Sequence, residues 1–305
     1  MSRHSHPWSA IALVALLLTA QASTLAAATA RALLIGINEY EQPGAPAAPG
    51  ATGAGSTVLE DRPSPTRGGP GQTGSTDTRV VSSWSPGRGA WTNLDGAVND
   101  ATAFAEILVS RYGFGRSDVR VLLNGDATRK RILAEIQTWL LDPAKAGDTC
   151  VFFYAGHGSQ VTNSLSPETD RRDETLVPVD SWTGAMDVRD KELARLFNRL
   201  LDKKVTLTAI LDSCHSGSIA RGFPAPGKTR YLAPDPRDAR DAGDKGPSPE
   251  QRGALILSAA QDDQVAGEQR DARGDPHGRF SAALIATLAS APICDPAEQI
   301  YRRVR

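Results

Sequence analysis

Short apolar runs alternate with amphipathic segments along most of this chain. The candidate strands are aliphatic and β-branched runs of strand length, at residues 31–40, 118–123, 148–155, 175–179, 205–211 and 253–260. The candidate helices carry apolar side chains at steps of three and four, at residues 93–111, 128–141, 189–201 and 280–288. This alternation predicts an α/β sandwich, in which helices flank a mainly parallel sheet.

The first 28 residues have the pattern of an export signal. Arg3 gives a positive start, residues 8–18 are largely apolar, and residues 20–22 read Ala-Gln-Ala, a small-residue cleavage site. The apolar run is short for a bilayer span. We therefore expect residues 1–28 to be a signal peptide and the protein to be exported, to the periplasm or the medium, with no stable membrane span after its removal. A retained membrane anchor is the alternative.

Three segments depart from the alternating pattern. Residues 41–91 contain ten Gly and seven Pro without a repeat, which favours a disordered insertion over a functional lid. Residues 222–250 are Pro-rich and charged, and are interpreted as a linker. Residues 291–305 form a C-terminal segment without a recognisable last strand, as in a truncated chain. The remainder of residues 31–290 then forms one domain.

Composition excludes several classes of protein. The chain has 34 basic and 35 acidic residues, so its charge gives no case for nucleic-acid binding. Its three cysteines, Cys150, Cys214 and Cys294, are too few for a disulfide framework and lack metal-site spacing. No G-x-S-x-G or P-loop motif supports an α/β hydrolase or a nucleotide-binding protein.

Two of the predicted strands end in reactive side chains. His157 follows the run at 148–155, and Cys214 follows the run at 205–211. Parallel strands open on the same edge of a sheet, where ligands bind, so the two residues are expected to meet there. An imidazole activates a thiol for nucleophilic attack. The backbone N–H groups of Gly158 and Cys214 could then stabilise the oxyanion of acyl transfer.

The alternative for each cysteine is a small buried hydrophobe. This alternative is favoured for Cys150, inside a strand, and for Cys294. It is disfavoured for Cys214, which lies at a strand end between Ser213 and His215. His215 is a poor candidate base, because neighbours on an extended chain point to opposite sides.

Several motifs, in this order, resemble the caspase-type cysteine peptidases, in the metacaspase and bacterial caspase-like branch. They are RALLIGINEY, LDGAVNDA, YAGHGSQ, DETLVPVD, LDSCHSG, LSAAQDDQVAGE and HGRFSAAL. The resemblance runs from about residue 32 to residue 288, interrupted by the insertion. It implies a caspase-haemoglobinase fold and hydrolysis of peptide bonds by a Cys–His dyad. Cys214 would be the nucleophile, and His157 the general base and acid.

The residue two before the nucleophile bears on specificity. Asp212 is acidic, and an acid that lines the pocket favours a basic P1 side chain by direct pairing. The resemblance implies that Asp212 and Asp100 line this pocket together. We therefore expect a protein or peptide substrate with Arg or Lys at P1. The sequence does not indicate an oligomeric state.

Two regulatory features follow from the resemblance. Calcium would act as an activator and not as a chemical cofactor, held by Asp170, Asp173 and Glu174, since hard cations take clustered carboxylates. The alternative is a solvated acidic loop. Self-cleavage would occur in the 222–250 linker, whose basic residues are Lys228, Arg230, Arg237 and Arg240. The alternative is an inert linker. A catalytically silent interaction module with a caspase fold is the alternative to the enzyme as a whole.

Overall fold

The computed structural model describes residues 28–40, 88, 91–214, 228–243, 246–259 and 266–304. The predicted signal peptide lies outside these residues except for residue 28, and the predicted insertion lies outside them except for residues 88 and 91. Nowhere in the described ranges is there a helix both long enough and apolar enough to cross a bilayer.

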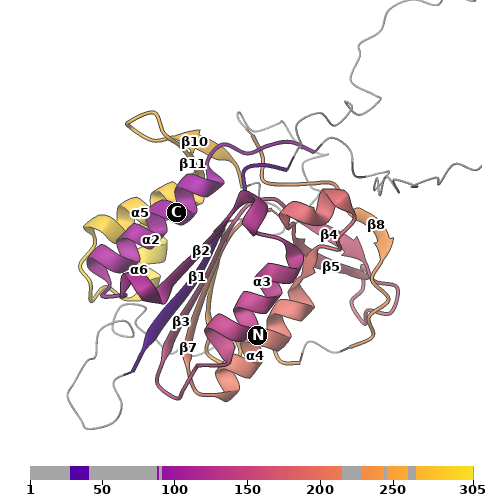
Figure 1. Ribbon diagram of the computed structural model, residues 1–305, viewed down its shortest axis with the longest axis horizontal. Coiled ribbons are helices and arrows are strands. Elements are labelled where there is room, and N and C mark those ends of the chain that lie inside the picture. The colour runs from indigo at the N-terminus through magenta and orange to yellow at the C-terminus, as the bar shows by residue number, and fades with distance from the viewer. Residues whose placement is uncertain are drawn as a thin grey trace, which may run out of the picture.

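A five-stranded parallel sheet forms the centre of the domain (Figure 1). Its strands, in spatial order, are β2 (Val119–Leu123), β1 (Ala30–Gly36), β3 (Thr149–Ala155), β7 (Thr206–Asp212) and β9 (Leu255–Ser258). Every neighbouring pair is parallel. The sheet confirms the predicted fold class, because each of the five strands falls within or next to a predicted apolar run.

Helices cover both faces of this sheet (Figure 1). One face carries α2 (Ala97–Arg111), α5 (Arg279–Ser290) and α6 (Ala297–Val304). The other carries α3 (Arg129–Glu135), the π-helical turn Ile136–Leu141 and α4 (Asp190–Asp202). Short 3-10 turns lie at Arg116–Asp118, Asn124–Asp126 and Val179–Thr183. The α6 helix was not predicted, because residues 291–305 are mostly polar.

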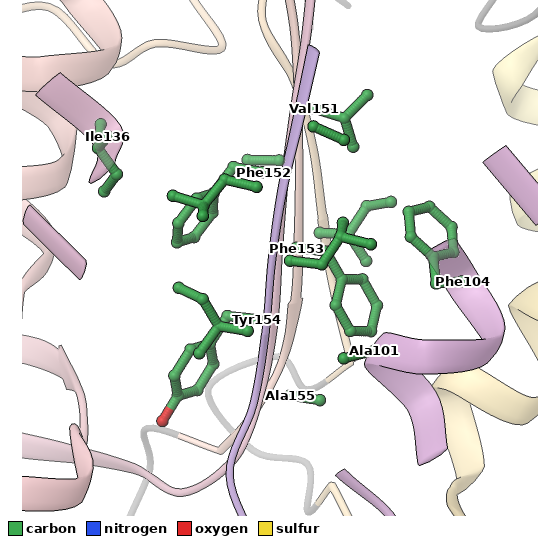
Figure 2. Close-up of a cluster of buried hydrophobic side chains, with 14 of the residues drawn as sticks. Ala101, Phe104, Ile136, Val151, Phe152, Phe153, Tyr154 and Ala155 are labelled. Atoms are coloured by element: carbon green, nitrogen blue, oxygen red, sulfur yellow. The ribbon is translucent and has the colours of Figure 1, made fainter. Parts of the chain in front are cut away.

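The β3 strand shows how one sequence serves both layers. All seven of its residues are buried, and successive side chains point to opposite faces. Phe153 stacks on Phe104 of α2, with ring centroids 4.9 Å apart. Phe152 packs edge-on against Phe197 of α4 at 5.4 Å. Figure 2 shows the two sets on either side of the strand. A strand that is buried on both faces is held in a fixed register, and it carries the segment that follows to a fixed place.

Smaller sheets extend the domain beyond the central one. A four-stranded sheet has the order β6 (Val188–Arg189), β5 (Arg172–Leu176), β4 (Gly158–Thr162) and β8 (Asp235–Asp238). A two-stranded sheet pairs β10 (Glu268–Arg270) with β11 (Pro276–Gly278). The strand predicted at residues 175–179 begins and ends three residues earlier, as β5. The interpreted linker contains β8, a strand that its proline and charges concealed.

The predicted helices at residues 93–111 and 128–141 differ from the observed ones at their ends. The first begins at Ala97 instead of residue 93, because distant groups bind the backbone before it. Leu94 N–H donates to the Asn38 backbone carbonyl, and the Glu268 carboxylate accepts from the N–H groups of the next two residues. The second is capped as expected by Thr128, whose hydroxyl accepts from Arg131 N–H at 3.3 Å. Its last turn is π-helical, Ile136–Leu141.

Candidate active site

The two predicted reactive residues follow neighbouring strands at the same sheet edge. Ala155, the last residue of β3, pairs with Asp212, the last residue of β7. Two residues after the end of β3 comes His157, and two residues after the end of β7 comes Cys214. Gly156 lies at the turn after β3, and a Cβ there would come within 2.6 Å of Tyr40 Oη and 2.7 Å of Tyr154 Oη. A glycine is therefore required for the histidine to follow the strand so closely.

Residues 228–232, which lie in the predicted linker, form an extended segment that crosses this edge. We call these residues the docked segment. Arg230 N–H donates to the Ala266 carbonyl at 2.9 Å, and the Lys228 carbonyl accepts from Glu268 N–H at 3.0 Å. On the other side of Arg230, Leu232 N–H donates to the Gly158 carbonyl at 2.9 Å. The backbone is thus bound as an added strand, which is one way that proteins hold extended peptides.

The carbonyl oxygen of Arg230 accepts two backbone hydrogen bonds. Gly158 N–H donates to it at 2.9 Å, and Cys214 N–H donates to it at 3.1 Å. These are the two groups that the sequence nominated as oxyanion donors. One carbonyl between two fixed N–H groups is polarised toward negative charge on its oxygen, which is the charge that develops during acyl transfer.

His157 is fully buried and immediately precedes Gly158 in the chain. Its Nε2 lies 2.7 Å from the Thr92 carbonyl, so Nε2 carries the proton and donates. Its Nδ1 is buried and has no hydrogen-bond partner among the described residues. Burial lowers the pKa of His157 to about 4, and the charge of Arg230 contributes in the same direction. The ring is therefore neutral near pH 7, with a free lone pair on Nδ1.

Cys214 is also fully buried, two residues after β7 ends. Ala266 N–H donates to its Sγ at 2.6 Å. Burial raises the pKa of the thiol to about 11, although the hydrogen bond from Ala266 acts against that rise. With the docked segment in place, the site thus holds a neutral thiol and a neutral imidazole.

The guanidinium of Arg230 lies in a buried acidic pocket. Its Nη2 is 2.6 Å from Asp100 Oδ2 and 3.2 Å from Glu268 Oε1, and its Nη1 is 3.0 Å from Asp212 Oδ2. Burial lowers the pKa of Arg230, but the three carboxylates outweigh burial and raise it overall. The structure thus brings together Asp100 and Asp212, which the sequence analysis assigned to one pocket, and adds Glu268.

Other residues that the sequence analysis did not single out hold the pocket acids in place. His277 Nδ1 lies 2.8 Å from Asp100 Oδ1, and Gly278 N–H donates to Asp100 Oδ2 at 2.9 Å. The Ser281 hydroxyl donates to Asp212 Oδ2 at 2.5 Å. His277, Gly278 and Ser281 all lie in the motif HGRFSAAL and Glu268 ends the motif LSAAQDDQVAGE, so the signal was present in the sequence, although without an assigned role.

The three residues nominated for calcium do not form one site. Asp173 is fully buried and bound by Lys191 Nζ at 2.7 Å and Arg189 Nη1 at 3.2 Å. Glu174 is exposed, on the opposite side of β5, and Asp170 lies in the turn before it. Within the described ranges, no group of three His, Cys, Asp or Glu side chains is placed to hold a metal ion. Asp170, Asp173 and Glu174 therefore do not fit a shared calcium site.

The remaining candidates lie apart from the pocket or outside the described residues. Arg237 pairs with Asp235, and Arg240 is largely exposed next to Asp238. His215 lies outside the described residues. Cys150 is buried inside β3, as its position in a strand predicted, whereas Cys294 is exposed. Of the four basic residues nominated for self-cleavage, Arg230 is the one whose carbonyl reaches the Gly158 and Cys214 N–H groups.

A parallel sheet that presents a cysteine and a histidine on adjacent strand ends defines an α/β protein with a caspase-like fold. The crystal structure of protein GSU0716 from Geobacter sulfurreducens shares this fold, with a TM-score of 0.57 and 20% sequence identity, over 90% of this chain and 88% of that one. Residues 87–221 match the family model described as metacaspase, peptidase C14 domain. The matched residues are therefore similar to the metacaspase branch of the caspase-type cysteine peptidases.

Curated relatives show the same similarity. Metacaspase-1A of Aspergillus fumigatus is 36% identical over 198 residues, which are 63% of this chain and 43% of that protein. Metacaspase-1A of Aspergillus niger is 35% identical over 156 residues, 49% of this chain and 38% of that protein. Metacaspase-1 of Schizosaccharomyces pombe is 29% identical over 155 residues, which are 49% of this chain and 36% of that protein. The chain thus spans less than half the length of these relatives.

Proposed function

We propose that this protein is a cysteine endopeptidase that hydrolyses peptide bonds after Arg or Lys, with Cys214 as nucleophile and His157 as general base and acid. The observation that carries the proposal is the position of Arg230, whose guanidinium contacts three carboxylates while its carbonyl accepts from two backbone N–H groups. The first set of contacts selects a basic side chain, and the second polarises the bond that follows it.

In the proposed reaction, Cys214 Sγ attacks the carbonyl carbon of the P1 residue and the thiol proton passes to His157 Nδ1. The hydrogen bond from Nε2 to the Thr92 carbonyl fixes the ring so that Nδ1 is the accepting atom. The tetrahedral oxyanion is held by the N–H groups of Gly158 and Cys214. The pair is neutral before attack and charged after it, so proton transfer must accompany bond formation.

The intermediate then collapses with cleavage of the C–N bond. His157 gives its proton to the leaving amine, and the P1 acyl group remains as a thioester on Cys214. A water molecule next attacks the thioester while His157 accepts one of its protons. That proton returns to Sγ as the C–S bond breaks, which regenerates the thiol and releases a carboxylic acid.

The pocket favours a basic P1 residue because any other P1 residue would leave its buried carboxylates without a positive partner. An acidic P1 side chain would meet Asp100, Asp212 and Glu268 in a buried pocket, and like charges there cost several kcal/mol. A neutral P1 residue would leave these carboxylates without their partner. The same pocket supports self-cleavage between Arg230 and Tyr231, because the chain's own Arg230 occupies the P1 position.

Fluorogenic peptides that differ only at P1 test the proposal. We expect Arg and Lys peptides to be cleaved and Asp peptides to be spared, with no cleavage by Cys214→Ala. Asp212→Asn should lower kcat/KM for the Arg peptide about 30-fold or more, the factor for breaking a buried charged contact. Preference for Asp at P1 would refute the specificity. A lack of any cleavage would favour a silent interaction module instead.

Two expectations from the sequence complete the proposal. Export to the periplasm or medium is supported by the signal pattern of residues 1–28, and an N-terminal sequence of the protein from each cell fraction tests it. Calcium activation is supported by the family resemblance alone, since Asp170, Asp173 and Glu174 do not form one site. Turnover that is unchanged in a chelator would remove it.

A further inference from the structure

The docked segment carries a second basic side chain on the side of the pocket. Lys228 lies two residues before Arg230, and residues two apart in an extended chain face the same way. Lys228 Nζ is 2.8 Å from Asp95 Oδ1. Asp95 lies just before α2, the helix that supplies Asp100 to the pocket. Lys228 and Arg230 therefore contact two carboxylates that come from one short stretch of chain.

Glu268 joins these two contacts. Its Oε1 accepts from Gly96 N–H at 2.9 Å and lies 3.2 Å from Arg230 Nη2. Its Oε2 accepts from Asp95 N–H at 2.9 Å. One buried carboxylate thus contacts the guanidinium at P1 and also fixes the backbone of the residue that receives Lys228.

The residue between the two basic ones is bound differently. Thr229 forms a backbone bridge with Gly267, which has no side chain that could select the side chain of its partner. A Cβ on Gly267 would meet its nearest atom, the Lys228 carbonyl oxygen, at 3.6 Å, so the backbone there has room. Acidic side chains therefore contact the first and third residues of this stretch, whereas the middle residue is held through its backbone. A site of this kind recognises every second side chain of an extended peptide.

We propose that the active site recognises peptides with basic residues at both P3 and P1, that Asp95 selects the P3 residue, and that Glu268 is a positioning residue that links the two subsites. The preferred class is Lys-x-Arg or Arg-x-Arg, cut after the second basic residue. This inference rests on the proposed peptidase activity and specifies its substrate further.

The P3 contact should have a modest and salt-dependent effect. The side chains of Lys228 and Asp95 are 45% and 50% exposed. Exposed ion pairs of this kind change a binding or rate constant by up to about five-fold. Such contacts are screened as ionic strength rises. We therefore expect P3 Lys to raise kcat/KM about two- to five-fold over P3 Ala at low salt, and by less in 1 M salt.

Three fluorogenic peptides that end in Lys-Thr-Arg, Ala-Thr-Arg and Glu-Thr-Arg separate this inference from the proposed function. Wild type should prefer them in that order. Asp95→Lys should reverse the order and favour Glu at P3, while Asp202→Lys, a charge reversal at an exposed carboxylate that pairs with Arg252, should retain it. Glu268→Gln should raise KM for all three and bring their rates closer together.

The outcomes are distinguishable. Equal rates for the three peptides in wild type, or an unchanged order in Asp95→Lys, would overturn the P3 inference and leave cleavage after Arg intact. A Glu268→Gln enzyme that is slower with its P3 preference unchanged would show that Glu268 does not link the subsites. If no peptide that ends in Arg is cleaved by wild type, the peptidase proposal fails and this inference fails with it.

Discussion

Replacing Arg230 by alanine should destabilise the fold through the pocket that it leaves behind. The side chains of Arg230 and Asp100 are fully buried, and that of Asp212 is 1% exposed. Removing one partner of a buried charged cluster costs about 3–5 kcal/mol, because the remaining charges stay buried without compensation. A whole domain is stable by only about 5–15 kcal/mol, so such a loss is readily measured.

The assay is urea unfolding in a Cys214→Ala background, which prevents cleavage. Arg230→Ala should lose about 3–5 kcal/mol of unfolding free energy at pH 8. The matched control is Arg240→Ala, whose side chain is 77% exposed, and surface changes of this kind stay within about 0.5 kcal/mol. Equal small losses in the two variants would refute the ion cluster as a source of stability.

The pH dependence gives a second readout. Burial raises the pKa of Asp212 above its ordinary value, while Arg230 acts against that rise. Without Arg230 the pKa rises further, so Asp212 takes up a proton in the folded state more readily than in the unfolded state. Protonation then favours the folded state as pH falls. The deficit of Arg230→Ala should therefore narrow between pH 8 and pH 5, and a constant deficit would contradict this account.

Two further predictions concern the same pocket. Gly278→Ala should abolish cleavage after Arg, since the added Cβ would lie 2.2 Å from Asp212 Oδ2; full activity toward Arg peptides would contradict the position of the pocket. His277→Gln should lose about 1–2 kcal/mol at pH 5 and less at pH 9, measured by urea unfolding. The hydrogen bond to Asp100 raises the pKa of His277 above 6.5, so its contribution is complete below that pH and disappears as pH rises through the raised value; equal losses at both pH values would exclude this pair.

The central sheet and the two strand ends could be predicted because they depend on local pattern. The β3 and β7 strands are continuous apolar runs that stop at polar residues, and the parallel arrangement then brings His157 and Cys214 to one edge. The short strands β4, β8 and β10 have no such pattern. The first two form by pairing with each other across a long stretch of chain, with Val161 of β4 beside Asp235 of β8, so their residues read as loops.

The occupant of the pocket could be nominated but not identified. Four basic residues in one Pro-rich segment are equivalent by composition, and only the fold selects Arg230, by pairing its backbone with Ala266. Glu268 illustrates the same limit, because it contacts a residue 38 positions earlier and a helix start 172 positions earlier. The residues predicted to bind calcium do not form one site, and here closeness in sequence was misleading. Asp173 and Glu174 are adjacent in a strand, so their side chains point to opposite faces.

Mass spectrometry of the purified protein tests the central claim most directly. Wild type should yield one fragment that ends at Arg230 and another that begins at Tyr231, while Cys214→Ala stays intact at that bond. Arg230→Lys should still be cut there and Arg230→Ala should not. The account would be contradicted if Cys214→Ala were cut at the same bond, or if wild type were processed only after Arg237 or Arg240 while the bond after Arg230 remained whole.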